Sequence, residues 1–292
     1  MPTPILAATD ISPLARFAVE RAALLSRERQ CPLRLVHVLN PFAWDHLRGF
    51  LPEPLRGGDP RNEARLGLDK LAADLAARHG LSDVSGGTAE GRASVQIVEQ
   101  ARKTGAGLVV LGAHGAGIMR DLALGGTAIK VLRASPCPVL VARLDPDRRY
   151  ARVLAATDFS ATATRALRVA LDGFPDAAHS IVHAYEVPYE GRMRLAGASD
   201  ENIERYRDQV RQDAQRKLDA FIADADYQAA GGVRGRVRHG FAAAVLLDEL
   251  ARSNADLLVL GKHGASALDE RLLGSVTLNL LHHAPCDVLL VP

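Results

Sequence analysis

The amino-acid sequence predicts an α/β protein made of two tandem doubly wound units, each with a five-stranded parallel sheet flanked by helices. Three observations support this prediction. The chain has 292 residues, enough for about two domains. The sequence repeats itself once along that length. Within each repeat, short apolar runs alternate with longer segments of helical periodicity.

The repeat relates the two halves of the chain at two separate places. Residues 5–25 (ILAATDISPLARFAVERAALL) are similar to residues 153–171 (VLAATDFSATATRALRVAL), and residues 108–143 are similar to residues 257–292. The first pair is offset by 148 residues and the second by 149. Because the two offsets agree within one residue, we interpret the chain as a duplicated domain.

A linker is expected between the last strand of the first copy and the first strand of the second. The segment LDPDRRYAR, residues 144–152, is polar and contains a proline, as linkers often do. The predicted domains are therefore residues 1–148 and 149–292.

The first copy contains five strand candidates and four helical patterns. The strand candidates are residues 5–9, 33–39, 82–90, 108–112 and 138–142, of which 82–90 has the weakest pattern. The helical patterns cover residues 12–28, 61–79, 93–104 and 120–134. Most strand candidates are apolar throughout, which is typical of parallel strands that helices cover on both faces.

The second copy has the same alternation. Its strand candidates are residues 152–157, 180–187, 233–239, 257–261 and 287–291. Its helical patterns cover residues 160–174, 200–225, 241–253 and 268–283. In both copies the spacers are long enough for the crossover helices that parallel strands require.

Composition excludes several classes of function. Lys and Arg number 36 against 34 for Asp and Glu, so the chain lacks the basic excess of nucleic-acid-binding proteins. No apolar run approaches the ~18 residues of a membrane-spanning helix. The start, MPTPILAATD, does not have the pattern of a signal peptide, so we expect a cytoplasmic location. The three cysteines are too few and too dispersed for a disulfide framework or a zinc site.

The repeated motifs fall where doubly wound sheets bind ligands, beyond the carboxyl ends of strands at the point where the strand order reverses. In the second copy Asp158 follows the first strand, and the sequence GKHG, from Gly261 to Gly264, follows the fourth. Glycines allow the backbone to approach an anion, and Ser275 offers a hydroxyl at a predicted helix start. The sequence therefore predicts a phosphate-binding site that is neither a Walker A loop nor a GxGxxG motif.

The spacing G-x2-G-x9-G-S, with the preceding Asp158, resembles the ATP-binding type of the universal stress protein family. The resemblance covers nearly the whole chain twice and implies a tandem member with strand order 3-2-1-4-5 in each copy. It implies that ATP binds with Mg²⁺, that Asp158 holds the ribose, and that the main chain at Ala184 meets adenine. The remaining residues of this implied site are Gly261, His263, Gly264, Gly274, Ser275, Val276 and Thr277.

The first copy departs from the family pattern at one position. Gly126 stands where the family has Ser or Thr, so a phosphate-facing hydroxyl is missing. Thr127 could replace it, but a displacement by one residue changes where the side chain points. We expect a weaker or empty site, formed by Asp10, Val38, Gly112, Gly115, Gly125, Gly126 and Thr127.

Several of these residues also fit structural roles. Asp10 and Asp158 precede helical patterns and could cap them. His114 and His263, in the repeated GxHG sequence, have no nearby nucleophile in an elbow motif, so a hydrogen bond that orders the loop fits better than base catalysis. His37 and His183 occupy matching positions in apolar strands, where we expect packed side chains with a hydrogen-bond partner.

The resemblance implies an ATP-binding stress-response protein that acts as a nucleotide-dependent regulatory or binding module. No dedicated catalytic set is visible. The alternatives are a slow ATPase or other adenine-nucleotide enzyme, and a non-nucleotide assembly scaffold. Family members commonly pair through the fifth strand, so we expect the two copies to pair within one chain through PVLVA and DVLLV. A homodimer is also possible.

Overall fold

The computed structural model describes residues 2–40, 59–113, 124–146, 149–224, 233–264 and 273–292. The chain divides into two compact units, Met1–Arg149 and Tyr150–Pro292. This division lies within one residue of the boundary expected from the repeat offsets. Each unit is described below by itself.

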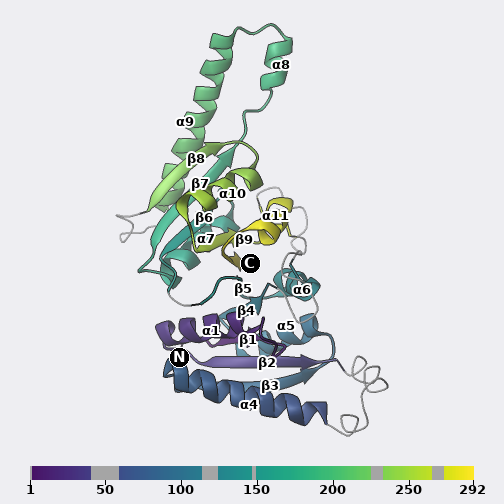
Figure 1. Cartoon of the computed structure of the whole chain (residues 1–292). Helices are drawn as coiled ribbons and strands as arrows, with labels where there is room; N and C mark the ends of the chain where they lie inside the picture. The colour runs from purple at the N-terminus through teal and green to yellow at the C-terminus, as the bar shows by residue number, and fades with distance from the viewer. Residues whose placement is uncertain (1, 41–58, 114–123, 147–148, 225–232, 265–272) are drawn as a thin grey trace. The chain divides into compact units, whose positions relative to one another are not determined.

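Unit 1 is a doubly wound parallel sheet with strand order β3-β2-β1-β4-β5, as predicted. Helices α1 and α4 pack on one face of the sheet, and α5 and α6 pack on the other (Figure 1). In chain order the described elements are β1 (Ile5–Ala8), α1 (Arg16–Arg29), β2 (Leu33–Leu39), α4 (Pro60–His79), β3 (Val84–Glu90), α5 (Ala93–Thr104), β4 (Leu108–Gly112), α6 (Gly126–Ala134) and β5 (Val139–Ala142).

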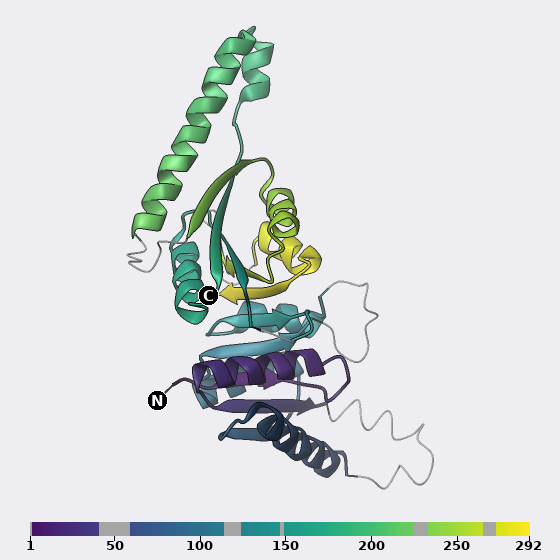
Figure 2. The ribbon, with the colours of Figure 1, turned by 60° about the vertical axis from the view of Figure 1, so that its left-hand side comes forward.

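Unit 2 repeats this architecture with strand order β8-β7-β6-β9-β10, all parallel. Helices α7 and α9 cover one face, and α10 and α11 cover the other. The elements are β6 (Arg152–Ala156), α7 (Ala161–Gly173), β7 (Ala178–Tyr185), α8 (Glu190–Leu195), α9 (Asp200–Asp224), β8 (Arg234–His239), α10 (Ala242–Ser253), β9 (Leu257–Gly261), α11 (Ser275–His283) and β10 (Asp287–Val291). Figure 2 shows α9 extending beyond the sheet of its own unit with α8 beside it.

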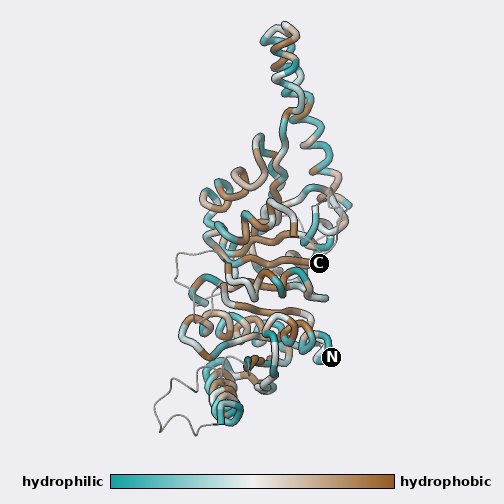
Figure 3. The backbone as a smooth tube through the Cα atoms, turned by 90° about the vertical axis from the view of Figure 1, so that its right-hand side faces the viewer, coloured by the Kyte–Doolittle hydropathy of each residue, from teal (hydrophilic) through white to brown (hydrophobic). Residues whose placement is uncertain are grey.

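The core of each unit is built from small and medium aliphatic side chains on the strands. β4 and β9 share the pattern of four consecutive buried residues followed by a half-buried glycine. Figure 3 shows the most hydrophobic stretches of the tube concentrated in the strands. Burying one such aliphatic side chain stabilises the fold by about 1.5 to 3 kcal/mol. The continuous apolar runs of the strands therefore contribute much of the stability of the core.

Three helix starts differ from the predicted ones by more than one residue. α1 begins at Arg16 rather than residue 12, because residues 12–15 form a turn in which Ser12 Oγ accepts the N–H of Ala15 at 3.2 Å. α6 and α11 begin at Gly126 and Ser275, each after an N-cap glycine with an extended backbone. The parts of the predicted helices at 120–123 and 268–272 lie outside the described residues.

The edge strand β8 carries three alternating arginines, Arg234, Arg236 and Arg238. Arg236 pairs with the buried carboxylate of Glu249 on α10 at 2.7 Å, and Arg238 pairs with Asp248 at 3.1 Å. Two of the three arginines therefore bind acidic residues of the same unit.

The described helices do not combine the length and apolar character that a membrane crossing requires. In the described part of the chain, Cys31, Cys137 and Cys286 form no disulfide.

Candidate functional site

Unit 2 contains a cavity of about 410 Å³ at the carboxyl ends of β6 and β9, the two strands between which the strand order reverses. Its apolar wall includes Val182, Leu246 and Leu260. The cavity brings together every residue that the sequence assigned to this site: Asp158, Ala184, Gly261, His263, Gly264, Gly274, Ser275, Val276 and Thr277.

The loop after β6 is shaped by its own short polar side chains. Thr157 Oγ1 accepts the N–H of Phe159 at 2.9 Å, and Asp158 Oδ1 accepts the N–H of Ser160 at 3.0 Å. Phe159 has a positive φ of 67°, which is rare for a bulky residue. These contacts hold the Asp158 carboxylate in a defined orientation at the cavity.

The alternative role of the two aspartates as helix caps is wrong. The N-cap of α7 is Ser160, whose Oγ accepts the N–H of Ala163 at 3.2 Å. In unit 1 the N-cap of α1 is Ala15, and Asp10 Oδ1 accepts the N–H of Ser12 at 3.0 Å. Each aspartate therefore forms a turn with the residue two positions later and is not the N-cap of the helix that follows.

The loop after β9 packs directly against the loop after β6. A Cβ built at Gly264 would lie 2.8 Å from Asp158 Oδ2, and one built at Gly261 would lie 3.0 Å from the carbonyl carbon of Thr162. Gly264 does not have a positive φ. Position 264 therefore requires glycine because the carboxylate of Asp158 approaches it closely, and not because the backbone angle is unusual.

The start of α11 forms another wall of the cavity. The carbonyl of Gly274 accepts the N–H of Leu278 at 2.9 Å, which is the first hydrogen bond of the helix. The N–H groups of Ser275, Val276 and Thr277 therefore have no acceptor within the helix. Such N–H groups, with the positive end of the helix dipole, favour an anion at this wall.

The two strand histidines are packed against the loops after the first strands, as predicted. His183 Nδ1 donates to the carbonyl of Thr157 at 2.8 Å, and His37 Nδ1 donates to the carbonyl of Thr9 at 2.9 Å. The His183 ring lies 4.2 Å from the Phe159 ring. Burial lowers the pKa of His183, which favours the neutral imidazole.

His263 orders its loop through the main chain. Its carbonyl accepts a hydrogen bond from Thr162 Oγ1 at 2.6 Å. Its imidazole Nδ1 is buried and has no hydrogen-bond partner within the described part of the chain. The expected loop-ordering hydrogen bond therefore exists, but the backbone makes it. His114, the matching residue of unit 1, lies outside the described residues.

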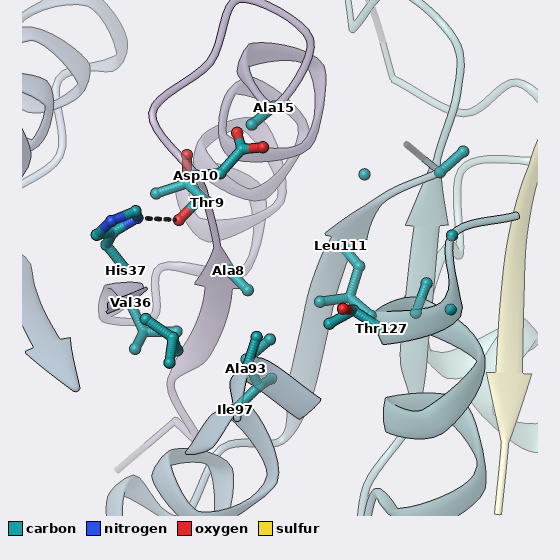
Figure 4. A pocket seen from close by; sticks show the side chains of 16 residues that line it. Ala8, Thr9, Asp10, Ala15, Val36, His37, Ala93, Ile97, Leu111 and Thr127 are labelled. Carbon is teal, nitrogen blue, oxygen red and sulfur yellow. Dashed lines mark hydrogen bonds between the residues drawn. The ribbon is translucent and has the colours of Figure 1, made fainter. Parts of the chain in front are cut away.

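Unit 1 has a matching cavity of about 370 Å³ (Figure 4). Asp10 lies at the end of β1, and Thr127 lies at the start of α6 across the cavity. A Cβ built at Gly126 would have nothing within 4 Å. The cavity brings together six of the seven predicted residues, Asp10, Val38, Gly112, Gly125, Gly126 and Thr127, while Gly115 lies outside the described residues.

Comparison with known protein families gives a match over both halves of the chain. The model of the universal stress protein family matches residues 1–143 and again residues 149–292. The chain belongs to the universal stress protein family.

Individual relatives agree with this assignment. Universal stress protein YxiE of Bacillus subtilis is 28% identical over 144 residues, which cover 48% of this chain and 97% of YxiE. A solved universal stress protein from Archaeoglobus fulgidus covers 100% of this chain and 98% of its own, with a TM-score of 0.68 and 20% identity. A putative universal stress protein from Pseudomonas aeruginosa covers 99% of this chain and 92% of its own, with a TM-score of 0.65 and 19% identity. At these identities the two structures show the fold.

The unit 2 cavity combines an apolar wall, one carboxylate and a helix N-terminus with hydroxyl groups. Among its described lining residues, Asp158 is the only acidic side chain. Within the described residues, no group of three or more His, Cys, Asp and Glu side chains is placed to hold a metal ion.

Proposed function

We propose that this universal stress protein is an ATP-binding module whose regulatory state or partners change with nucleotide occupancy. The supporting observation is the combination, within one cavity of unit 2, of an apolar wall, the oriented carboxylate of Asp158 and the N-terminus of α11. An adenine nucleotide presents the three complementary groups: a flat apolar base, a ribose with hydroxyl donors, and phosphates.

The proposed roles follow the positions of these groups. Asp158 accepts from the ribose hydroxyls, and the main chain at Ala184 meets adenine beside Val182 and Leu246. The phosphates are held where backbone N–H groups gather and side chains are small. The residues of this phosphate subsite are Gly261, His263, Gly264, Gly274, Ser275, Val276 and Thr277.

Magnesium fits this site as a companion of the phosphates. Mg²⁺ in nucleotide sites usually keeps several waters and takes one or two carboxylates in addition to phosphate oxygens. The described lining of the cavity offers a single carboxylate, Asp158, and the hydroxyls of Ser275 and Thr277. A bound Mg²⁺ would therefore depend mainly on ATP itself and would neutralise part of the phosphate charge.

A matched pair of aspartate variants tests the proposal. Asp158→Ala should abolish tight ATP binding to the full chain in calorimetric titration, whereas Asp10→Ala should leave the tight site intact. The two changes remove the same turn hydrogen bond from equivalent loops, 3.0 Å in both, so their structural cost is similar. Tight binding that survives Asp158→Ala would overturn the proposed site.

Two further measurements separate the rival functions. Denaturing the purified protein and identifying any released nucleotide tests which ligand it carries, and failure of ATP, ADP and AMP to bind would favour a scaffold. Steady-state release of ADP under saturating ATP would instead indicate a slow ATPase.

The cytoplasmic location, the pairing of the two units within one chain and a homodimer stay predictions.

A further inference from the structure

The first turn of α7 is hydrogen-bonded to the loop after β9 through Thr162, a residue that the motif does not include. Thr162 Oγ1 donates to the carbonyl of His263 at 2.6 Å. A hydroxyl has one hydrogen, so the 3.0 Å contact between Ser160 Oγ and Thr162 Oγ1 has Ser160 as its donor. Ser160 Oγ in turn accepts the N–H of Ala163. The helix start and the loop are therefore joined by one continuous chain of hydrogen bonds, whose members strengthen one another.

This hydrogen bond fixes the peptide plane between His263 and Gly264. In a trans peptide the carbonyl and the N–H point in opposite directions. Holding the carbonyl of His263 toward α7 therefore aims the N–H of Gly264 away from α7. Glycines at 261 and 264 give the loop many accessible backbone conformations. A hydrogen bond from outside the loop is therefore needed to select one orientation of this peptide.

Unit 1 has no hydroxyl at the position that matches Thr162. Ser12 Oγ accepts the N–H of Ala15 at 3.2 Å, the counterpart of the contact between Ser160 and Ala163 in unit 2. The residue between them that matches Thr162 is Leu14. Leucine has no hydrogen-bond donor in its side chain, so Leu14 cannot donate as Thr162 does.

We propose that Thr162 is a positioning residue for the nucleotide site of unit 2, holding the peptide between His263 and Gly264 in its binding orientation before the ligand arrives. The inference rests on the proposed function. A loop that is already ordered costs less entropy when the phosphates bind, which increases affinity without a direct contact to the ligand. The inference also adds a second difference between the two units, independent of Gly126.

Three variants of the full chain test this role by calorimetric titration with ATP. Thr162→Val keeps the shape of the side chain but removes the donor, and should weaken binding roughly three- to tenfold, the net worth of one neutral hydrogen bond. Thr162→Ser restores the hydroxyl and should recover most of the affinity. Thr164→Val is the matched control, because Thr164 Oγ1 donates to the carbonyl of Ser160 within the same helix turn. It should bind ATP like the parent.

Amide hydrogen exchange without nucleotide provides a second readout. Thr162→Val should increase exchange in the peptide that covers residues 261–264, and Thr164→Val should not. Equal ATP affinity and equal exchange in Thr162→Val and the parent would overturn this inference alone. A parent that binds no adenine nucleotide would overturn the proposed function, and with it the role of Thr162 in ligand binding.

Discussion

At the scale of single residues, the short distance between Gly264 and the carboxylate of Asp158 has a direct consequence for binding. A Cβ at position 264 would approach Asp158 Oδ2 to 2.8 Å, closer than a side chain tolerates. Valine would add two methyl groups in the same space. We therefore expect Gly264→Val to displace the carboxylate and to abolish the tight ATP site in calorimetric titration.

The repeat supplies the comparison for this variant. Gly115→Val changes the matching glycine of unit 1, at a position outside the described residues, and should alter the tight site little. Circular dichroism must show that both variants remain folded. Tight binding that survives Gly264→Val but disappears with Gly115→Val would reverse the assignment of the strong site.

The sequence was informative about which residues line the cavities and less so about how they are held. Glycine spacing and the aspartate after the first strand fix the lining because the topology brings these two loops to one edge of the sheet. The hydrogen bond from Thr162 to His263 depends on how closely the start of α7 approaches the loop after β9. The two residues are 101 positions apart in the chain. The spacing of the glycines along the sequence does not indicate how closely these two segments approach. The available sequence signal for this hydrogen bond was a threonine at the second position of the helix that follows Ser160.

At the scale of elements, both units use a glycine in the edge strand to let a long helix approach. Gly86 on β3 pairs with Leu35, and Gly235 on β8 pairs with Ile181, the matching position of β7. A Cβ at Gly86 would lie 3.0 Å from the Cβ of Leu68 on α4. In unit 2 the corresponding Cβ would lie 2.6 Å from Ile222 Cδ1 on α9.

Two adjacent glycines of β3 allow a matched test of this packing. Gly86→Ala should lower the free energy of unfolding by about 1 to 3 kcal/mol, the usual cost of overpacking, because α4 must shift. Gly87→Ala adds a methyl group with nothing within 4 Å and should be neutral or stabilising by up to about 1 kcal/mol. Urea unfolding measures both, and hydrogen exchange in α4 locates the change. Equal effects of the two variants would contradict the packing argument.

Element types were more predictable than element starts. The pattern at 93–104 predicted α5 at its observed bounds, because the apolar period and the helix coincide there. At α1 the periodic pattern begins at residue 12, but Ser12 and the residues up to Ala15 form a turn. The short helix α8 was not predicted. It has six residues and no buried side chain, so it leaves no apolar period in the sequence.

At the scale of the whole molecule, the duplication has produced two similar cavities with different polar groups. Unit 2 has Ser275 at the first position of α11 and Thr162 beside the loop. Unit 1 has Gly126 and Leu14 at these positions. Both differences remove a hydroxyl from unit 1, so we expect one tight and one weak ATP site in each chain.

The size of this asymmetry follows from the missing hydroxyl at position 126. One hydrogen bond to a charged phosphate oxygen is worth about 1.5 to 3 kcal/mol, which corresponds to roughly a tenfold to hundredfold difference in affinity. Gly126→Ser should therefore strengthen the weak site by a comparable factor. The new side chain is accommodated, because a Cβ there has nothing within 4 Å.

Gly126→Ala separates the hydroxyl from the effect of the added carbon. Alanine and serine both replace glycine at the first position of α6 and both favour the helix over glycine. Only serine adds a hydrogen-bond donor toward the cavity. Titration of the full chain should therefore show a stronger second site in Gly126→Ser and little change in Gly126→Ala. Equal gains in both variants would assign the asymmetry to helix formation, and two equally tight sites in the parent would show that Thr127 already supplies the hydroxyl that Gly126 lacks.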